Sequence, residues 1–222
     1  MDMKIIEVKQ SIFADNDADA ERLRQQLKSE GTFLLNVMSS PGSGKTTTLV
    51  RTINALSDEF RIGIMEADID SDVDARTMSE NTKAKTIQIH TGGMCHLDAD
   101  MTRQGITELG TADVDLAILE NVGNLVCPAE FDTGASKNVM ILSVPEGHDK
   151  PLKYPLIFTV CDALLINKID VLPYFDFDMD KVTEYAHMRN PDIKIFPICA
   201  KTGEGMDAWY EWLRTEVKEW RS

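Results

Sequence analysis

The chain lacks any run of about 18 uninterrupted apolar residues, the length that a membrane-spanning helix requires. It also lacks the basic start and apolar stretch of a secretory signal, because its first twenty residues carry five acidic side chains. We therefore expect a soluble protein of the cytoplasm that does not associate with a membrane.

Basic residues are scarce as well. The chain has 23 Lys and Arg residues against 37 Asp and Glu residues, which gives a formal net charge of -14 at pH 7. A surface with this charge repels the phosphate backbone of DNA or RNA over most of its area. Nucleic acid is therefore not an expected partner.

Cysteine is sparse, with four residues spread widely through 222 residues. This spacing in a sizeable domain is not that of a disulfide framework and favours reduced thiols, some of them candidate metal ligands. Cys161 and Cys199 lie in apolar surroundings, which favours a place in the core. Cys95 and Cys127 lie in more polar segments and are the candidates for chemistry.

Short apolar runs alternate with longer segments of mixed polarity through most of the chain. The apolar runs suit strands that are buried on both faces, and they cover 33–38, 62–65, 86–89, 116–119, 139–144, 163–166 and 193–198. The mixed segments suit helices, and the clearest cover 47–57, 98–109 and 180–189. This pattern predicts an α/β, three-layer P-loop NTPase fold: a mostly parallel sheet of about seven strands with helices on both faces and ligands at the carboxyl ends of the strands.

The length favours one main domain. We assign residues 32–222 to a P-loop GTPase domain and residues 1–31 to an N-terminal extension with an amphipathic helix over 18–30. A closing helix is predicted over 206–220, where apolar residues at helical spacing either pack on the sheet or form a dimer contact. The segment 171–178 is expected to be an exposed loop.

A phosphate-binding loop is the first functional motif. The apolar run 33–38 leads into Ser-Ser-Pro-Gly-Ser-Gly-Lys-Thr at 39–46 and then into a predicted helix, an arrangement in which successive backbone N–H groups surround a phosphate. The full motif has glycine where this chain has Ser39. Lys45 supplies a cation to the β and γ phosphates, and the Thr46 hydroxyl is a candidate magnesium ligand. The predicted phosphate-binding residues are Gly42, Ser43, Gly44, Lys45, Thr46 and Thr47.

A guanine-binding motif, Asn-Lys-Ile-Asp at 167–170, follows the apolar run 163–166. The Asp170 carboxylate can accept two hydrogen bonds from guanine, which adenine does not offer, so it is expected to select GTP and GDP over ATP. The Lys168 stem can lie over the base, and Asn167 can tie this loop to the phosphate-binding loop. Cys199, Ala200 and Lys201, after the last predicted strand, form a plausible second base-contacting loop.

Magnesium requires further oxygen ligands. Asp68 and Glu120 follow two predicted strands and are expected to lie at the same sheet edge as Thr46; Asp70, Asp72 and Asp74 are alternatives that suit solvated loop charges better. With Lys45, Asp68 and Glu120 are the candidate catalytic residues, one carboxylate orienting the attacking water. The sequence displays no obvious catalytic glutamine or arginine, so we expect slow intrinsic hydrolysis.

A thiol and imidazole group forms a second candidate site. Cys95 and His96 precede a predicted helix, where a helix start is expected to favour the Cys95 thiolate. Cys127 follows Glu120 by seven residues and leaves the sheet at the same edge, so the three groups can converge on a soft metal. A buried thiol beside a hydrogen-bonded histidine is the alternative at this point.

Three long motifs, together with the guanine-binding motif, resemble the hydrogenase nickel-incorporation GTPases of the HypB family, which belong to the SIMIBI class. They are ENVGNLVCP at 120–128, GMCHLDA at 93–99 and EGHDKPLKYP at 146–155. The resemblance implies a nucleotide-dependent homodimer that delivers nickel to the hydrogenase large subunit together with other maturation proteins. It also implies that Cys95, His96 and Cys127 bind Ni²⁺ or Zn²⁺, with a choice that soft ligands alone do not determine.

Three other interpretations compete with this one. A urease-type UreG GTPase shares the nucleotide motifs but uses a Cys-Pro-His metal motif that the sequence lacks. The others are a P-loop kinase or ATPase that acts on a small metabolite, and a GTPase switch without a metal. In our preferred interpretation the segment 120–127 joins the two sites, so that loss of the γ phosphate changes metal affinity.

Overall fold

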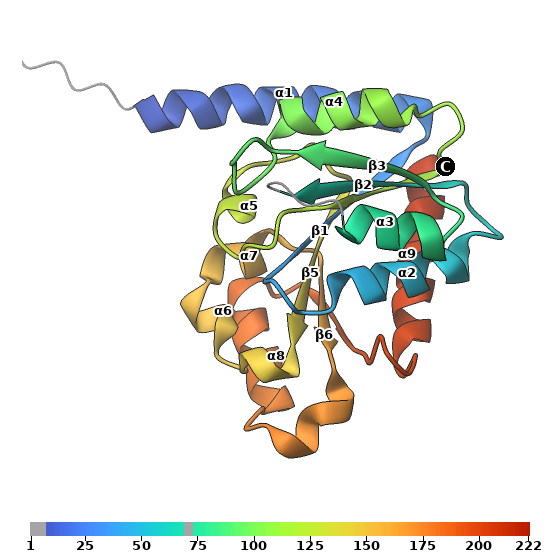
Figure 1. The fold of residues 1–222 in the computed structure, drawn as a ribbon. Coiled ribbons are helices and arrows are strands. Elements are labelled where there is room, and N and C mark those ends of the chain that lie inside the picture. The colour runs from blue at the N-terminus through green and yellow to red at the C-terminus, as the bar shows by residue number, and fades with distance from the viewer. Residues whose placement is uncertain (1–7, 69–72) are drawn as a thin grey trace, which may run out of the picture.

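The computed structural model of the 222-residue chain describes the backbone of residues 8–68 and 73–222, and side chains from residue 13 onward. Its centre is a seven-stranded sheet in the order β3-β2-β4-β1-β5-β6-β7 (Figure 1). All neighbouring strands are parallel. The strands are β1 Phe33–Ser39, β2 Ile62–Asp68, β3 Lys85–His90, β4 Leu116–Glu120, β5 Lys137–Ser143, β6 Ala163–Asn167 and β7 Lys194–Pro197. The predicted fold class is confirmed.

The central strands extend past their apolar runs into polar residues at the carboxyl ends. β1 ends at Ser39, β2 at Asp68 and β4 at Glu120. The strands predicted over 33–38, 62–65 and 116–119 ended earlier, because the prediction used hydrophobicity alone. Since all strands are parallel, these polar ends lie at one edge of the sheet, where ligands bind in folds of this kind.

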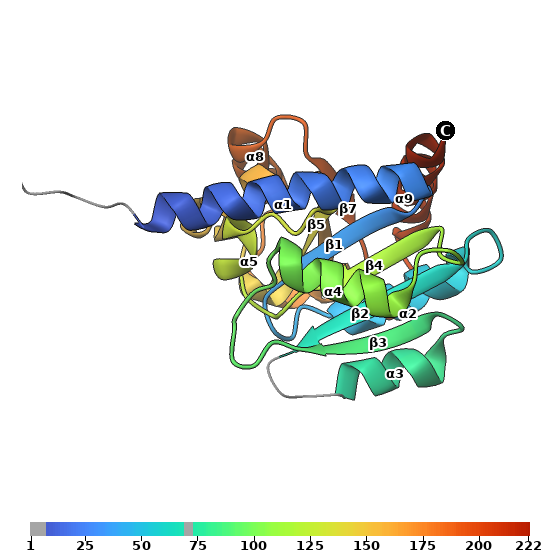
Figure 2. The same cartoon turned by 90° about the horizontal axis from the view of Figure 1, so that it is seen from above.

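Helices cover both faces of the sheet (Figures 1 and 2). On one face α2, α3 and α9 share a core with β1 and β2. On the other face α1 and α4 pack near β2 and β4, and α7 and α8 pack near β5 and β6. The longer helices are α1 Val8–Glu30, α2 Lys45–Leu56, α3 Val73–Asn81, α4 Ala99–Leu109, α7 Pro155–Val160, α8 Met179–Arg189 and α9 Met206–Arg221. Short helical turns are α5 Cys127–Glu130, η1 Val144–Glu146, α6 Lys150–Lys153 and η2 Ile169–Tyr174.

The closing helix α9 packs on the sheet. Trp209, Leu213 and Val217 are buried within the core that includes α2. The Trp209 indole Nε1–H donates a hydrogen bond to Thr52 Oγ1 at 2.9 Å, which satisfies the polar atom of a buried aromatic side chain. Burial of these residues stabilises the domain by roughly 2 kcal/mol per large apolar side chain.

Helix α1 is longer than the sequence predicts, because it begins at Val8 and not near residue 18. Many of its residues are polar, and Asp15, Asp17 and Asp19 alternate near its middle, so the apolar spacing there was too weak to predict a helix. Leu23 and Leu27 are fully buried and share a core with residues of α4. The two helices lie side by side in both views (Figures 1 and 2).

The segment 171–178 is more ordered than the predicted loop. It begins within η2; Tyr174 and Phe175 are exposed, at 82% and 45%, whereas Phe177 is partly buried against the core. Across the described ranges, every helix is too short or too polar to span a bilayer.

Candidate functional site

The phosphate-binding loop turns directly from β1 into α2. Gly42 and Gly44 adopt the left-handed backbone region, with φ of +76° and +92°, where a side chain is disfavoured. Gly44 is also confined, because a Cβ atom there would lie 2.4 Å from Asn167 Nδ2. Helix α2 begins at the next residue, Lys45, so the free amides of its first turn face the loop.

A cavity of about 520 Å³ opens over this loop. Lys45 lies within it, with Nζ 2.9 Å from Glu120 Oε1 and donating a hydrogen bond to Asn121 O at 3.1 Å. The Glu120 side chain is only 1% exposed. The cavity is lined by residues 39–47 together with Asp68, Asp74, Glu120, Val122 and Gly123. The structure thus brings the predicted phosphate-binding residues and both predicted carboxylates to one place.

The alternative magnesium ligands divide into two groups. Asp74, at the start of α3, is exposed but accepts a hydrogen bond from Thr46 Oγ1 at 3.0 Å and lines the cavity. It is therefore part of the site and not a purely solvated loop charge. Asp70 and Asp72 lie outside the described residues.

Glu66 is a buried acid of the site that the sequence reasoning missed. It stands opposite Glu120 in the register of β2 and β4 and is 3% exposed. Burial, and then the neighbouring Glu120 carboxyl group, raise its pKa from 4.5 to about 11. A hydrogen bond joins the two carboxyl groups across the paired strands. Alternation along a strand places Glu66 on the same face as Asp68, a signal that could have identified it.

Asn167 joins the phosphate-binding loop to both loops that are predicted to contact the base. Its Nδ2 donates a hydrogen bond to Ser43 O at 2.9 Å, and its Oδ1 accepts hydrogen bonds from Lys168 N at 2.8 Å and Ala200 N at 3.0 Å. The side chain is 2% exposed. Lys168 has a φ of +64° and donates from Nζ to Gly42 O at 2.7 Å, so it also crosses to the phosphate-binding loop.

Asp170 lies at the start of η2 and is contacted by the neighbouring loop. The Cys199 thiol donates a hydrogen bond to Asp170 Oδ1 at 3.2 Å. Cys199 is 1% exposed, as is Cys161, so both thiols occupy the core as predicted. Cys199 has an additional role, because its thiol holds the carboxylate that was predicted to contact guanine.

Glu146 is a second acid that was not predicted as a site residue, although it lies in the motif 146–155. Its Oε2 accepts hydrogen bonds from Ser143 N and Ser143 Oγ, both at 2.7 Å, and its Oε1 accepts one from Ser40 Oγ. Glu146 therefore connects the end of β5 to the phosphate-binding loop. His148 in the same motif accepts a hydrogen bond from Asp178 N at 3.3 Å, which gives this histidine a structural partner.

The thiols of Cys95 and Cys127 meet at the same edge of the sheet. Cys127 raises the pKa of Cys95 through a hydrogen bond, and burial adds to the effect. The expectation that a helix start favours the Cys95 thiolate was wrong. Helix α4 begins only at Ala99, with Asp98 as its N-cap, so Cys95 lies in the preceding turn beside another thiol and not in the field of the helix.

His96 lies beside Cys95, with Nδ1 3.9 Å from Cys95 Sγ. The ring stacks on Phe131 with centroids 3.9 Å apart and an interplanar angle of 9°. Burial lowers the pKa of His96, which favours the neutral imidazole that binds metals. No group of three or more His, Cys, Asp or Glu side chains is arranged to hold a metal ion within residues 8–68 and 73–222 of this one chain. The two thiols are brought together, but they are not part of a closed site.

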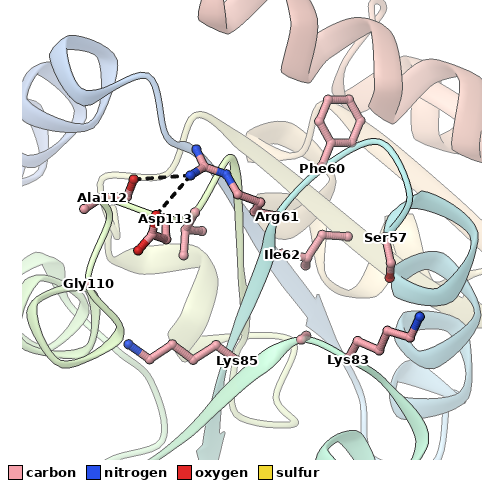
Figure 3. Close-up of a pocket in the computed structure, with 11 residues that line it drawn as sticks. Ser57, Phe60, Arg61, Ile62, Lys83, Lys85, Gly110, Ala112 and Asp113 are labelled. Atoms are coloured by element: carbon pink, nitrogen blue, oxygen red, sulfur yellow. Dashed lines mark hydrogen bonds and ion pairs between the residues drawn. The ribbon is translucent and has the colours of Figure 1, made fainter.

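A separate cavity of about 430 Å³ lies at the opposite edge, near the amino ends of β2 and β3 (Figure 3). Its cationic residues include Arg61, which pairs with Asp113 at 3.2 Å and Asp115 at 2.7 Å. Lys85 donates a hydrogen bond to Leu109 O. Arg61 and Lys85 already bind protein groups, and the lining holds the acid Asp113 as well as Lys83, so the cavity does not resemble a phosphate site.

Comparison with known proteins identifies the relatives of the chain. Residues 33–197 match the family model described as CobW/HypB/UreG, nucleotide-binding domain. The hydrogenase maturation factor HypB of Rhizobium leguminosarum bv. viciae is 46% identical over 214 residues, covering 96% of this chain and 71% of the relative.

Two solved structures are also similar. The crystal structure of HypB from Archaeoglobus fulgidus has a TM-score of 0.84 and 38% identity, covering 92% of this chain and 99% of that chain. The structure of HypB from Helicobacter pylori in complex with nickel has a TM-score of 0.85 and 36% identity, covering 92% and 96% of the two chains.

Proposed function

The chain belongs to the HypB members of the CobW/HypB/UreG family, and we propose that it is a GTP-hydrolysing metallochaperone that delivers nickel during maturation of nickel-iron hydrogenase. The observation that carries the proposal is the placement of the phosphate-binding cavity and the Cys95–Cys127 thiols at one edge of the sheet. We further propose that the bound nucleotide and dimerisation control the affinity of the chain for the metal.

The nucleotide part of the proposal depends on the residues around the 520 Å³ cavity. The proposed phosphate contacts are those of residues 42–47, with Lys45 beside the β and γ phosphates. Asp170 accepts hydrogen bonds from guanine, while Lys168 and the loop of Cys199, Ala200 and Lys201 hold the base. Asn167 supports this arrangement, since its amide already connects the phosphate-binding and base-contacting loops.

The chemistry of the cavity suits magnesium. The Thr46 hydroxyl and the Asp68 and Glu120 carboxylates are hard oxygen ligands of the type that Mg²⁺ prefers. The Glu120 carboxylate lines the cavity and pairs with Lys45, so its oxygens lie beside the space that the phosphates and Mg²⁺ would occupy. When bound, Mg²⁺ neutralises charge on the phosphates.

Catalysis then depends on how the protein positions the γ phosphate, the attacking water and the charged groups around them. We propose that Lys45, Asp68 and Glu120 act at the γ phosphate, with one carboxylate orienting water. The cavity presents no arginine or glutamine among its described lining residues, so hydrolysis by the isolated chain is expected to be far slower than the roughly 10 per second of a median enzyme.

The metal part of the proposal assigns Cys95, His96 and Cys127 as ligands of nickel, the cargo. One chain supplies two thiols and one imidazole, whereas the sulfur and nitrogen sites of such metals commonly have four ligands. Zinc fits the same ligands. We assign nickel as the cargo because the Helicobacter pylori relative is a nickel complex.

A homodimer can complete the ligand set. Apolar side chains are exposed beside the thiols: Met94 is 44% exposed and Val126 is 49% exposed. Leu156, 45% exposed, lies on α7, which contacts the Cys127-bearing turn α5. Such a surface suits a twofold interface, in which a second copy places the same residues opposite. The hydrogenase large subunit and other maturation proteins are the proposed further partners.

A nickel titration by calorimetry tests this function. We expect the wild type and a Cys161→Ala control to bind nickel alike, because Cys161 is a buried core thiol. Cys127→Ala should bind at least about tenfold more weakly, the loss expected when a ligand or its support is removed. Equal affinity in Cys127→Ala and wild type would leave only a GTPase without a metal role.

A further inference from the structure

Helix α1 contacts both segments that carry the metal-binding groups. Asn16 is 8% exposed and lies between them. Its Oδ1 accepts a hydrogen bond from Ala99 N at 2.9 Å, three residues after His96, and its Nδ2 donates to Asp132 O at 3.0 Å, five residues after Cys127. One buried amide therefore bridges two backbone segments that are far apart in the sequence.

The same helix extends an aromatic stack to the imidazole. Phe13 lies with its ring centroid 5.0 Å from that of Phe131, at an interplanar angle of 46°. Phe131 also contacts His96, whose ring stacks on it with centroids 3.9 Å apart. The ring orientation of His96 is thus fixed by a residue of the Cys127 segment, and that residue is in turn held by α1.

A third connection holds the Cys127 segment against α1. Arg24 Nη2 lies 2.7 and 2.8 Å from the two Asp132 carboxylate oxygens, and Arg24 Nε donates to Ala135 O at 3.0 Å. Helix α1 is itself fixed, since Leu23 and Leu27 are buried in the core with α4. Helix α1 is therefore packed on the domain through these leucines.

We propose that α1 positions the metal-binding groups, and that Asn16 is the positioning residue that holds Cys95 and His96 at the right separation from Cys127. The inference rests on the proposed metal-binding function. Metal–sulfur bonds are short, about 2.3 Å for zinc, so both thiols must be held close together before a metal can bridge them. Groups that orient metal ligands typically affect affinity by 10–100-fold.

Capping of α4 is the competing role for Asn16, because its Oδ1 accepts a hydrogen bond from the first amide of that helix. Two substitutions separate the roles. Asn16→Ala removes both hydrogen bonds, whereas Asn16→Asp keeps the acceptor for Ala99 N–H and puts a charged acceptor in place of the donor to Asp132 O. The matched control is Gln25→Ala on the exposed face of α1, where Gln25 bonds only Glu21 among the described residues.

The experiment measures nickel affinity by calorimetry and the nickel–thiolate charge-transfer absorption, with folding checked by circular dichroism. We expect Asn16→Ala and Asn16→Asp to weaken nickel binding by about 10–100-fold and to alter the absorption band, with Gln25→Ala within twofold of wild type. Phe131→Leu, which removes the flat surface under His96, should weaken binding in the same direction. It also provides a second variant if Asn16→Ala fails to fold.

Wild-type affinity in Asn16→Ala, or its recovery in Asn16→Asp, would overturn the inference, because the residue would then have no role or only cap α4. A failure of the underlying function looks different. In that case the wild type and Gln25→Ala would themselves bind no nickel, or Cys127→Ala would bind it as tightly as the wild type.

Discussion

Replacing Asn167 by alanine should damage both stability and nucleotide binding. The substitution removes hydrogen bonds to Ser43 O, Lys168 N and Ala200 N, at 2.9, 2.8 and 3.0 Å. Each bond contributes about 0.5–1.5 kcal/mol net, and more where the remaining partner stays buried. We therefore expect the free energy of unfolding to fall by about 2–4 kcal/mol.

The loss at the nucleotide site has a separate cause. Without the amide of Asn167, the phosphate-binding loop and the base-contacting loops are no longer held in register, and nucleotide binding must order them. A cost of about 2 kcal/mol corresponds to roughly 30-fold weaker GTP binding. Urea denaturation measures the first effect, and titration with a fluorescent GTP analogue measures the second.

Asn190→Ala is the matched control. Asn190 makes comparable bonds, donating from Nδ2 to Cys161 O at 2.8 Å and accepting from Asp192 N at 3.0 Å, but it precedes β7 at the opposite edge of the sheet. It should lose stability and keep GTP affinity within twofold. The reasoning is refuted if Asn167→Ala also keeps wild-type GTP affinity while losing stability to the same extent as Asn190→Ala.

Substitutions at three further residues test other parts of the site. Asp170→Ala should reduce the preference for GTP over ATP by at least about 100-fold, since two hydrogen bonds to a charged acceptor contribute about 1.5–3 kcal/mol each; an unchanged ratio in competition binding would remove Asp170 from the base site. Cys199→Ser should keep GTP affinity because a hydroxyl can donate to Asp170 as the thiol does, whereas Cys199→Ala should weaken it several-fold in the same titration. Glu66 binds a proton more tightly in the folded than in the unfolded chain, so the stability of the wild type should decline as pH rises from 4.5 toward 11. Glu66→Gln, which is neutral throughout, should lack this decline; denaturation between pH 6 and 9 should show the difference growing by at most about 1.4 kcal/mol per pH unit, and parallel curves would contradict the raised pKa.

The sequence predicts the fold well because its strands are buried on both faces. All seven apolar runs become strands, and parallel pairing follows from the helices between most of them. The first half of α1 was not predicted, because its polar residues carry little helical hydrophobic pattern. What holds it is contact with distant segments, such as the bonds of Asn16 to Ala99 and Asp132.

Site residues could be predicted where they belong to motifs that are continuous in the sequence. They were harder to predict where only the pairing of strands brings them together. Lys45 and Glu120 belong to local motifs, and the structure places them 2.9 Å apart. Glu66 was missed because its importance comes from standing opposite Glu120, which only the pairing of β2 and β4 defines. The pKa of Cys95 was predicted in the wrong direction for a similar reason, since its neighbour Cys127 is 32 residues away in the chain.

The central claim joins the nucleotide cavity to the thiols through the segment 120–127. Glu120 faces Lys45 at one end, Val122 lines the cavity, and Cys127 meets Cys95 at the other end. A displacement of Glu120 on loss of the γ phosphate can therefore reach Cys127 through the six residues between them, of which Asn121, Val122 and Leu125 are buried.

The most direct test is the nickel affinity of the wild type with a non-hydrolysable GTP analogue and with GDP, measured by calorimetry at the same protein concentration and with excess magnesium. Coupling between two sites typically amounts to about 1–3 kcal/mol, so the two dissociation constants should differ by at least about fivefold, and the difference should disappear in Cys127→Ala. Dissociation constants that agree within twofold in the wild type would contradict the account.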